Sequence, residues 1–347
     1  MKTENITPFI DSTSLVCDTV ALRAVLREKG YLLIRGILDH KSVDHTRRAI
    51  EAVVERSGWL LPGTSASERR PDMRHACVEP QPEFRRVYDK VFALEAFHTL
   101  SHCPSLTALI GGLLDTPEPL VHPRKIGRLI FPAPSEGMGF STPAHQDYWA
   151  IQGAPDTLTV WMPLHDCSFE QGSLMIAEGT HRDGMFPYRL ALGAGAVEVS
   201  DPLDGRWRGG DLHAGDILIF YTMTVHKAAP NRTNRMRFSI DSRYQRPLDP
   251  ITEPCLNLDG MGYDWRDVYA EWESRELQYY WKKWSLRVKP YSTKYYARRD
   301  ELAFEEGRNG NPIAISSLQR ISQYHPNPSV RDEAGRILKS LESINYE

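Results

Sequence analysis

Apolar residues recur at the spacing of an α-helix through much of the first third of the chain. The pattern predicts helices over 18–28 and 42–55, with a short apolar strand over 31–36 between them. Residues 61–84 are polar and contain several Gly and Pro, which predicts a loop. Helical spacing then returns over 84–114. The chain therefore opens with a helical layer that includes one strand.

From residue 125 the apolar pattern changes to the short runs that are typical of β-strands. These runs predict strands over 125–131, 158–164, 171–176, 217–221 and 237–244. The stretch over 185–213 holds several Gly at irregular spacing and predicts a long loop, of the kind that often forms a lid or a substrate wall. Strands thus dominate the middle of the chain.

After residue 250 the composition shifts, and we expect two units, 1–250 and a helical extension over 251–347. The pattern predicts a long aromatic-rich helix over 264–283 and a helix pair over 312–343. The aromatic stripe of the long helix must be buried, because its exposure would leave a large apolar patch. We expect it to pack on the preceding unit or on a second copy of the chain, which would make the protein a homo-oligomer.

Residues 281–299 mix Lys and Arg with Trp and Tyr, a composition also found in nucleic-acid-binding segments. The stretch is short, no nucleic-acid motif accompanies it, and the formal net charge of the chain is −3. Charge runs are usually solvated surface. The stretch therefore predicts a packed helix with a solvated basic face and no nucleic-acid partner.

Composition places the 347 residues among ordinary globular proteins. No apolar run approaches the roughly 18 residues that a membrane helix needs, so we expect no membrane partner. The N-terminal residues lack the basic-then-apolar pattern of a secretory signal. The five cysteines are scattered without a Cys-x-x-Cys pair, which favours reduced thiols over a disulfide frame. We expect a cytoplasmic protein.

Two histidines and one aspartate form the candidate metal site. His145 and Asp147 lie two residues apart, and on a strand they would point to the same face. His226 follows the apolar run over 217–221. Two imidazoles and one carboxylate can occupy one face of an iron(II) ion and leave its other positions open. The sequence predicts no catalytic residue beyond these three ligands.

The order of motifs around this set resembles the phytanoyl-CoA dioxygenase family of iron(II)/2-oxoglutarate oxygenases. The motifs that carry the resemblance are His145-Gln146-Asp147, Trp161-Met162-Pro163-Leu164-His165-Asp166, Gly172-Ser173-Leu174, Gly179-Thr180-His181, Ala214-Gly215-Asp216 leading to His226, and Asn231 leading to Arg237. The ordered pattern covers roughly residues 120–246. The resemblance implies a mainly β fold with α-helices, a double-stranded β-helix or jelly roll, flanked by N-terminal helices and the C-terminal helical extension.

The resemblance also implies iron(II), 2-oxoglutarate and O2, with release of succinate and CO2 as a small-molecule metabolite is hydroxylated or otherwise oxidised. The co-substrate's 5-carboxylate would meet Arg237, with a hydroxyl contact from Ser239 on the same strand face. Arg235 shares this face and is the rival. Trp161 would wall the pocket, and Gln146 is a further candidate cofactor contact. Because Asp147 is kept, oxidation is expected rather than halogenation, while Ala228 stands where some relatives carry a hydroxyl residue.

Four residues are candidates for the substrate pocket: Arg128, Tyr148, Trp149 and His181. Arg128 is either a surface charge or an anion contact inside a pocket, and the pattern leaves both open. His181 is the main rival for the distal ligand, although its flanking turn favours a structural role. His165 and His213 have no such context, and we expect them at the surface.

Two other functions stay open on the sequence alone. A jelly roll can hold a metal enzyme that does not use 2-oxoglutarate, and dependence of turnover on 2-oxoglutarate separates the two. The same fold can also serve a non-catalytic binding protein, which a failure to bind iron would favour.

Overall fold

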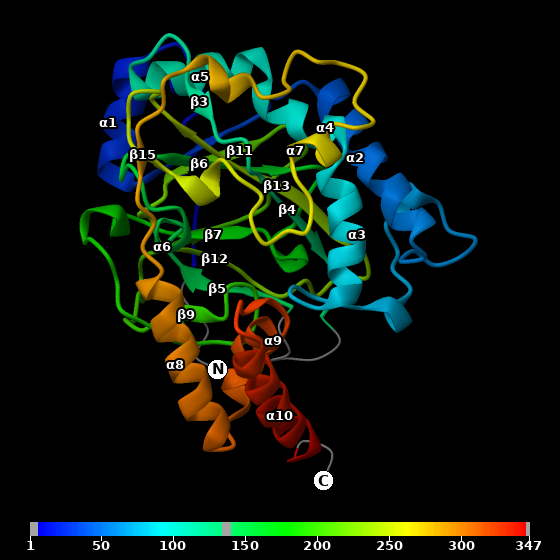
Figure 1. Ribbon diagram of the computed structural model, residues 1–347. Coiled ribbons are helices and arrows are strands. Elements are labelled where there is room, and N and C mark those ends of the chain that lie inside the picture. The colour runs from blue at the N-terminus through cyan, green and yellow to red at the C-terminus, as the bar shows by residue number, and fades with distance from the viewer. Residues whose placement is uncertain (1–5, 134–139, 345–347) are drawn as a thin grey trace.

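The computed structural model describes residues 6–133 and 140–344, and two large β-sheets form its centre (Figure 1). The smaller sheet has the order β1-β10-β7-β12-β5, and the larger has the order β2-β11-β6-β13, with β3 and β4 both paired to β13. The strands of the smaller sheet are Thr7–Pro8 (β1), Trp207–Gly209 (β10), Leu174–Ala177 (β7), His226–Ala228 (β12) and Thr142–His145 (β5). Those of the larger sheet are Tyr31–Ile34 (β2), Ile217–Tyr221 (β11), Leu158–Pro163 (β6), Arg237–Gln245 (β13), Leu120–Val121 (β3) and Ile126–Ile130 (β4).

The two sheets enclose a core of their own. Trp161 of β6 packs in one buried cluster with Leu174 and Ile176 of β7, so the inner faces of the sheets meet. Apart from the β1–β10 pair, the strand pairs within these two sheets are antiparallel. The fold is therefore a mainly β jelly roll with flanking helices, and the predicted fold class is confirmed.

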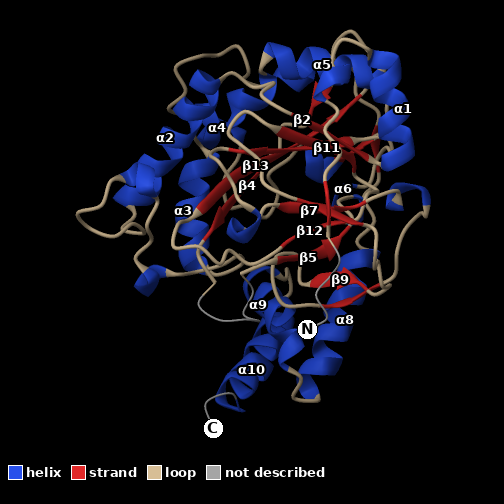
Figure 2. Ribbon diagram, turned by 180° about the vertical axis from the view of Figure 1, so that it is seen from behind, coloured by secondary structure: helices blue, strands red, loops and turns tan. Residues whose placement is uncertain are grey.

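The N-terminal helices cover the outer face of the larger sheet (Figure 2). They are Thr19–Lys29 (α1), His40–Arg56 (α2), Pro82–Phe92 (α3), Glu95–Thr99 (α4) and Pro104–Leu114 (α5). Their apolar faces share one buried cluster with the outward side chains of the sheet, such as Val160 and Ile240. The sequence explains the ends of α1: the Asp18 carboxylate accepts a hydrogen bond from the Ala21 amide at 2.9 Å, and Gly30 turns into β2 at a φ of +80°.

The predicted long helix over 264–283 is wrong. Only Trp265–Val268 (α7) and the 3-10 turn Tyr280–Lys283 are helical. Between them the backbone is held by tertiary contacts, since the amides of Glu273 and Ser274 donate to the Glu95 carboxylate of α4. The aromatic stripe is nevertheless buried as expected, because Trp265 and Trp281 join the cluster under the N-terminal helices.

The predicted loop over 185–213 is also corrected, because it contains three short strands. Tyr188–Leu190 (β8) pairs with Val197–Val199 (β9), and β10 joins the smaller sheet. Runs of two or three strand residues are too short to show alternation. A further small pair consists of Ile251–Thr252 (β14) and Val288–Lys289 (β15).

The C-terminal residues form a bundle of helices beside β8 and β9 (Figure 1). Its members are Lys294–Arg308 (α8), Ile315–Tyr324 (α9) and Pro328–Ile344 (α10), so the predicted helix pair is confirmed and the helix expected within 281–299 begins only at Lys294. Ala303, Leu318 and Ala334 form the buried centre of the bundle. Among the described residues, no helix is both long and apolar enough to cross a membrane.

Candidate active site

Two histidines face each other across neighbouring strands of the smaller sheet. His226 on β12 pairs directly with His145 on β5, and the ring centroids lie 4.2 Å apart. The Nδ1 atom of His145 lies 2.8 Å from the Pro143 carbonyl oxygen, and that of His226 lies 3.1 Å from the Thr224 carbonyl oxygen. A carbonyl only accepts, so each Nδ1 carries the proton, and each Nε2 keeps its lone pair for a metal.

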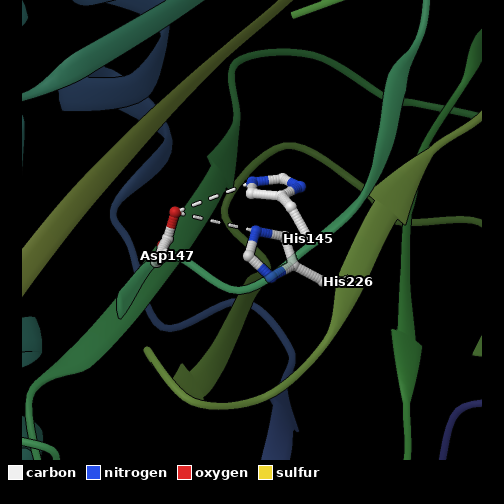
Figure 3. A group of neighbouring side chains, drawn as sticks. All are labelled: His145, Asp147 and His226. Carbon is white, nitrogen blue, oxygen red and sulfur yellow. Dashed lines mark ion pairs between the residues drawn. The ribbon is translucent and has the colours of Figure 1, made fainter. Parts of the chain in front are cut away.

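Asp147 joins the histidines by a different route from the one predicted. Strand β5 ends at His145, and Asp147 has helical backbone angles just before the single turn Tyr148–Ile151 (α6). Its Oδ1 atom still lies 3.8 Å from His145 Nε2 and 3.9 Å from His226 Nε2 (Figure 3). Ligand atoms of the three residues all lie within 4.8 Å of one another. The turn, and not strand alternation, brings the carboxylate to the histidines.

Both carboxylate oxygens of Asp147 accept hydrogen bonds from the larger sheet. Thr159 Oγ1 on β6 donates to Oδ2 at 2.7 Å, and Arg243 Nη2 on β13 donates to Oδ1 at 2.9 Å. The smaller sheet thus supplies the two imidazoles, and the larger sheet fixes the carboxylate that faces them.

Electrostatics hold the three groups in the protonation states that bind metals. Burial, with a contribution from His226, lowers the pKa of His145 to about 3, and burial also lowers the pKa of His226. Burial alone would raise the pKa of Asp147, but Arg243 and the two histidines outweigh it and keep that pKa well below its usual range. Neutral imidazoles and an ionised carboxylate therefore coexist at neutral pH, and this donor set fits iron(II).

A buried cation lies on the same inner face of the larger sheet. Arg237 begins β13, is 2% exposed, and has its guanidinium carbon 6.0 Å from the ring centroid of Trp161. Its Nη1 donates to the Gly172 carbonyl oxygen, but its Nε and the Ser239 hydroxyl are buried and have no partner in the part of the chain that the structure describes. No carboxylate within the described part of the chain lies at ion-pair distance from Arg237. Unpaired buried donors of this kind indicate a binding site for an anion.

Comparison with known proteins decides the family. The model of the phytanoyl-CoA dioxygenase (PhyH) family matches residues 26–239, more than half of the chain. The chain belongs to the phytanoyl-CoA dioxygenase family. It is an iron(II)- and 2-oxoglutarate-dependent oxygenase, with O2 as the second co-substrate.

Its curated relatives include two bacterial hydroxylases. The 1-deoxypentalenic acid 11-beta-hydroxylase of Streptomyces arenae is 26% identical over 271 residues, which are 70% of this chain and 87% of the relative. The enzyme of the same name from Streptomyces exfoliatus is 28% identical over 259 residues, with the same shares. Among solved structures, the epimerase SnoN in complex with Fe3+, alpha ketoglutarate and nogalamycin RO is 20% identical, with a TM-score of 0.47 over 67% of this chain and 85% of that one.

In this PhyH-family oxygenase, the two arginines that compete for the co-substrate differ in burial. Arg235 is exposed and lies in the turn before β13, so it does not share the strand face that the sequence suggested. Arg237 is buried inside the barrel. The strand begins only at Arg237, and this removes the ambiguity of register.

Arg128 points into the barrel, because it pairs with Ser239 across β4 and β13 and cross-strand partners share a face. Its Nε donates to Asp241 Oδ2 at 3.3 Å, and its Nη1 lies 3.7 Å from Glu79 Oε2. It lines a small cavity of about 30 Å³ together with Thr142 of β5. Of the two readings of Arg128, the structure gives the interior one.

Gln146 is placed differently from the predicted cofactor contact. Its amide nitrogen donates to the carbonyl oxygens of Gly184 and Met223 at 2.8 and 2.7 Å, and its amide oxygen accepts from the Phe186 amide at 2.9 Å. Both ends of the side chain are thus taken by backbone groups. Gln146, between two of the proposed metal ligands, therefore hydrogen-bonds to the loop at 184–186 and to the loop at Met223.

The remaining candidates lie around the barrel. Trp149 packs with Met175 on the outer face of the smaller sheet, and with Tyr148 it lines a cavity of about 430 Å³ beside residues 289–295. His181 lies outside the metal group: its Nε2 is 3.0 Å from the Arg27 carbonyl oxygen, and its ring stacks on Tyr221 at 5.0 Å.

Of the two other histidines, His213 is exposed as expected, but the expected exposure of His165 is wrong. His165 is buried and accepts a hydrogen bond from the Phe238 amide at 3.0 Å.

Sequence reasoning missed three polar residues of the site: Thr159, Asp241 and Arg243. The signal was present, since strand alternation puts Asp241 and Arg243 on the face of Arg237. Nothing in the pattern of β13 shows that Arg243 on its inner face meets the Asp147 carboxylate, which follows β5 in the opposite sheet; only the folded barrel brings them together.

Proposed function

We propose that His145, Asp147 and His226 hold the iron(II), and that Arg237 with Ser239 holds the far carboxylate of 2-oxoglutarate. The enzyme would hydroxylate or otherwise oxidise a small-molecule metabolite and release succinate and CO2. One observation supports this most: a compact His–Asp–His set lies in the same barrel interior as a buried arginine that has no anionic partner among the described residues. A bound metal would use the lone pairs of the His–Asp–His set, and the far carboxylate of 2-oxoglutarate would accept hydrogen bonds from Arg237.

Each residue has a physical role in this proposal. The iron, when bound with 2-oxoglutarate and O2, supplies the oxidising chemistry. The Pro143 and Thr224 carbonyl oxygens orient the two imidazoles, and Thr159 fixes the carboxylate of Asp147. Arg237, beside Trp161, offers a planar pair of donors that matches a carboxylate. Because both Asp147 oxygens are held, the carboxylate stays a ligand and leaves no vacant position for a halide.

The first substrates to test are small carboxylic acids. The two Streptomyces relatives are named for an acid, and Arg128 brings a second arginine to the inner face beside Ser239. Glu79 lies closer to Arg320 of α9, at 3.2 Å, than to Arg128. Arg128 would keep its contact with Asp241, and a substrate anion would compete mainly with the longer contact to Glu79.

The test measures succinate formation with iron(II), 2-oxoglutarate and a panel of carboxylic acids, each beside its amide. We expect succinate above the substrate-free background for some acids, and none without 2-oxoglutarate. His226→Ala should abolish the signal. Turnover that does not need 2-oxoglutarate would favour another metal enzyme, and a folded protein that binds no iron would favour a binding protein.

We also propose that the basic C-terminal segment binds no nucleic acid. Its aromatic rings are used within the protein, since Trp281 is buried and Lys282 lies over the Tyr279 ring at 4.2 Å. Salt-sensitive DNA or RNA binding near physiological salt would contradict this. Light scattering would test the alternative that the C-terminal helices join two copies of the chain.

A further inference from the structure

Arg243 contacts the carboxylate that we assign to the metal, from inside the larger sheet. It lies on the inner face of β13, is 3% exposed, and is the direct cross-strand partner of Thr159 on β6. These neighbours reach the same carboxylate, one at each oxygen of Asp147. Thr159 and Arg243, neighbours in the larger sheet, thus fix the orientation of the Asp147 carboxylate toward the histidines of the smaller sheet.

The two oxygens of Asp147 are not equivalent. Oδ1 is the atom that lies 3.8 and 3.9 Å from the histidine Nε2 atoms, and it is also the atom that Arg243 contacts at 2.9 Å. Oδ2 is taken by the Thr159 hydroxyl, which carries no charge. A carboxylate oxygen has two lone pairs, so Oδ1 can serve a metal and Arg243 together. The metal would then share its oxygen with a fixed positive charge.

The pair is well shielded from water. The side chains of Arg243 and Asp147 are 4% and 7% exposed, so their attraction is screened far less than that of a surface pair. Arg243 has no second carboxylate among the described residues, and its Nε is buried without a partner. Of the carboxylates in the described ranges, Asp147 alone balances this charge, and Asp147 would also balance part of the metal charge.

We infer that Arg243 is an internal counter-ion of Asp147, which keeps the ligand set assembled without metal and weakens metal binding by sharing Oδ1. This inference rests on the proposed role of Asp147 as a ligand. Without metal, Arg243 neutralises the buried carboxylate. With metal, the same charge repels the dication. Arg243 is in this sense a positioning residue that sets how readily the enzyme gains and loses its metal.

The test titrates metal-free protein with Co(II) and follows its absorption bands. Arg243→Gln keeps an N–H donor for Oδ1 and removes the charge, so Co(II) should bind about tenfold tighter or more, because a repulsion in a weakly screened site is removed. Arg243→Lys keeps the charge and should bind Co(II) like the wild type. Thr159→Val is the matched control, since it removes the neighbouring hydrogen bond without changing charge, and it should not tighten binding. Unchanged or weaker binding in Arg243→Gln overturns the inference.

A second readout follows the iron itself. Loss of a nearby positive charge favours the ferric state, so the midpoint potential of bound iron should fall in Arg243→Gln and stay near the wild-type value in Arg243→Lys. A purely structural role for Arg243 would not separate the two variants by charge. Equal potentials in the two variants would contradict the inference.

A double-mutant cycle needs no metal and covers the case in which Arg243→Gln folds poorly. Asp147→Asn leaves Arg243 as an unpaired buried charge and should lower the Tm of the metal-free protein. Adding Arg243→Gln to Asp147→Asn should raise the Tm again, because no buried charge is left unpaired. A double variant no more stable than Asp147→Asn overturns the counter-ion role. Failure of the wild type to bind Co(II) or iron(II) would instead count against the proposed function.

Discussion

The two faces of strand β13 are equally buried but chemically opposite. Every residue of the strand is buried. The outer face carries Phe238, Ile240, Ser242 and Tyr244, and the inner face carries Arg237, Ser239, Asp241, Arg243 and Gln245. The apolar outer residues pack under the N-terminal helices, whereas the inner residues make polar contacts: Arg243 with Asp147, Asp241 with Arg128, and Gln245 with His122. Burial alone therefore does not separate core from site, and the polarity of the buried face does.

The inner face also shows how a protein holds several charges in its interior. Arg243 is paired with Asp147, and Arg128 is paired with Asp241. Arg237 has no such partner within the described ranges, although burying an unpaired charge is costly. An unpaired cation among paired ones is the feature that a bound anion explains. The following substitutions test whether the two faces of β13 have these separate roles.

The largest effect is expected where the inner face meets the smaller sheet. His226→Ala should abolish metal-dependent turnover and iron(II) binding, because one of three ligand positions is lost. The fold should persist, since a metal ligand set is not part of the apolar core. Circular dichroism and iron content of the purified variant check this. His181→Ala is the matched control and should keep its iron; loss of iron in this variant and not in His226→Ala would move the third ligand to His181.

On the outer face, Ile240→Ala should cost about 2–5 kcal/mol of unfolding free energy, because it leaves a cavity in a packed core. The residue is fully buried among the apolar side chains of the N-terminal helices. Urea unfolding measures the loss. The 2-oxoglutarate requirement of the folded fraction should stay near that of the wild type. A large change in that requirement without a loss of stability would show that the two faces are not separate.

On the inner face, Arg237→Ala should have the opposite profile. Losing a charged contact to a desolvated carboxylate should cost about 2–4 kcal/mol, so the 2-oxoglutarate requirement should rise about 30-fold or more. Iron affinity should change little, and the unfolding free energy should not fall, because an unpaired buried charge is removed. Arg237→Lys should restore only part of the effect, because an ammonium cannot match the planar fork. Arg235→Ala, at an exposed position, is the control; a large effect there and none at Arg237 would contradict the assignment.

Much of this contrast could be predicted from the sequence. The apolar runs locate β6, β11 and β13 to within a residue or two, because long buried strands leave a strong pattern. The alternation on β13 also places Arg237 and Ser239 together. These predictions succeed where local pattern and final environment agree.

The misses have tertiary causes. The segment over 264–283 has helical spacing, but the amides of Glu273 and Ser274 in its middle donate to Glu95, a residue far away in the sequence. Asp147 leaves its strand because the chain turns into α6, which no periodicity shows. His165 resembles a surface histidine until the Phe238 amide supplies its partner. Each of these depends on a neighbour that only the folded chain provides.

Lys125 is a buried cation on the outer side of the larger sheet, and it differs from the arginines of the inner face. It lies just before β4 and is 1% exposed, and within the described ranges its Nζ lies near the His122 carbonyl oxygen at 3.3 Å and the Tyr280 ring at 5.8 Å. Burial lowers the pKa of Lys125 from 10.5 to about 7. In contrast to Arg128 and Arg243, it has no carboxylate partner among the described residues. A cation on the packing side can lose its proton, whereas the arginines on the inner side cannot.

This difference predicts a pH dependence of stability. Between pH 7 and 10.5 the unfolded chain binds the Lys125 proton and the folded chain does not, so stability rises with pH in this window. The rise attributable to Lys125 should approach about 1.4 kcal/mol per pH unit at most.

Below pH 7 both states are protonated, and the folded state carries an unpaired buried charge. Lys125→Met removes this charge, so the variant should be more stable than the wild type at pH 7, and the two should converge toward pH 10. Denaturant unfolding of both proteins across that range tests this. Parallel stability curves would show that Lys125 keeps its ordinary pKa and has a partner or water access in solution; the two faces would then treat their cations alike.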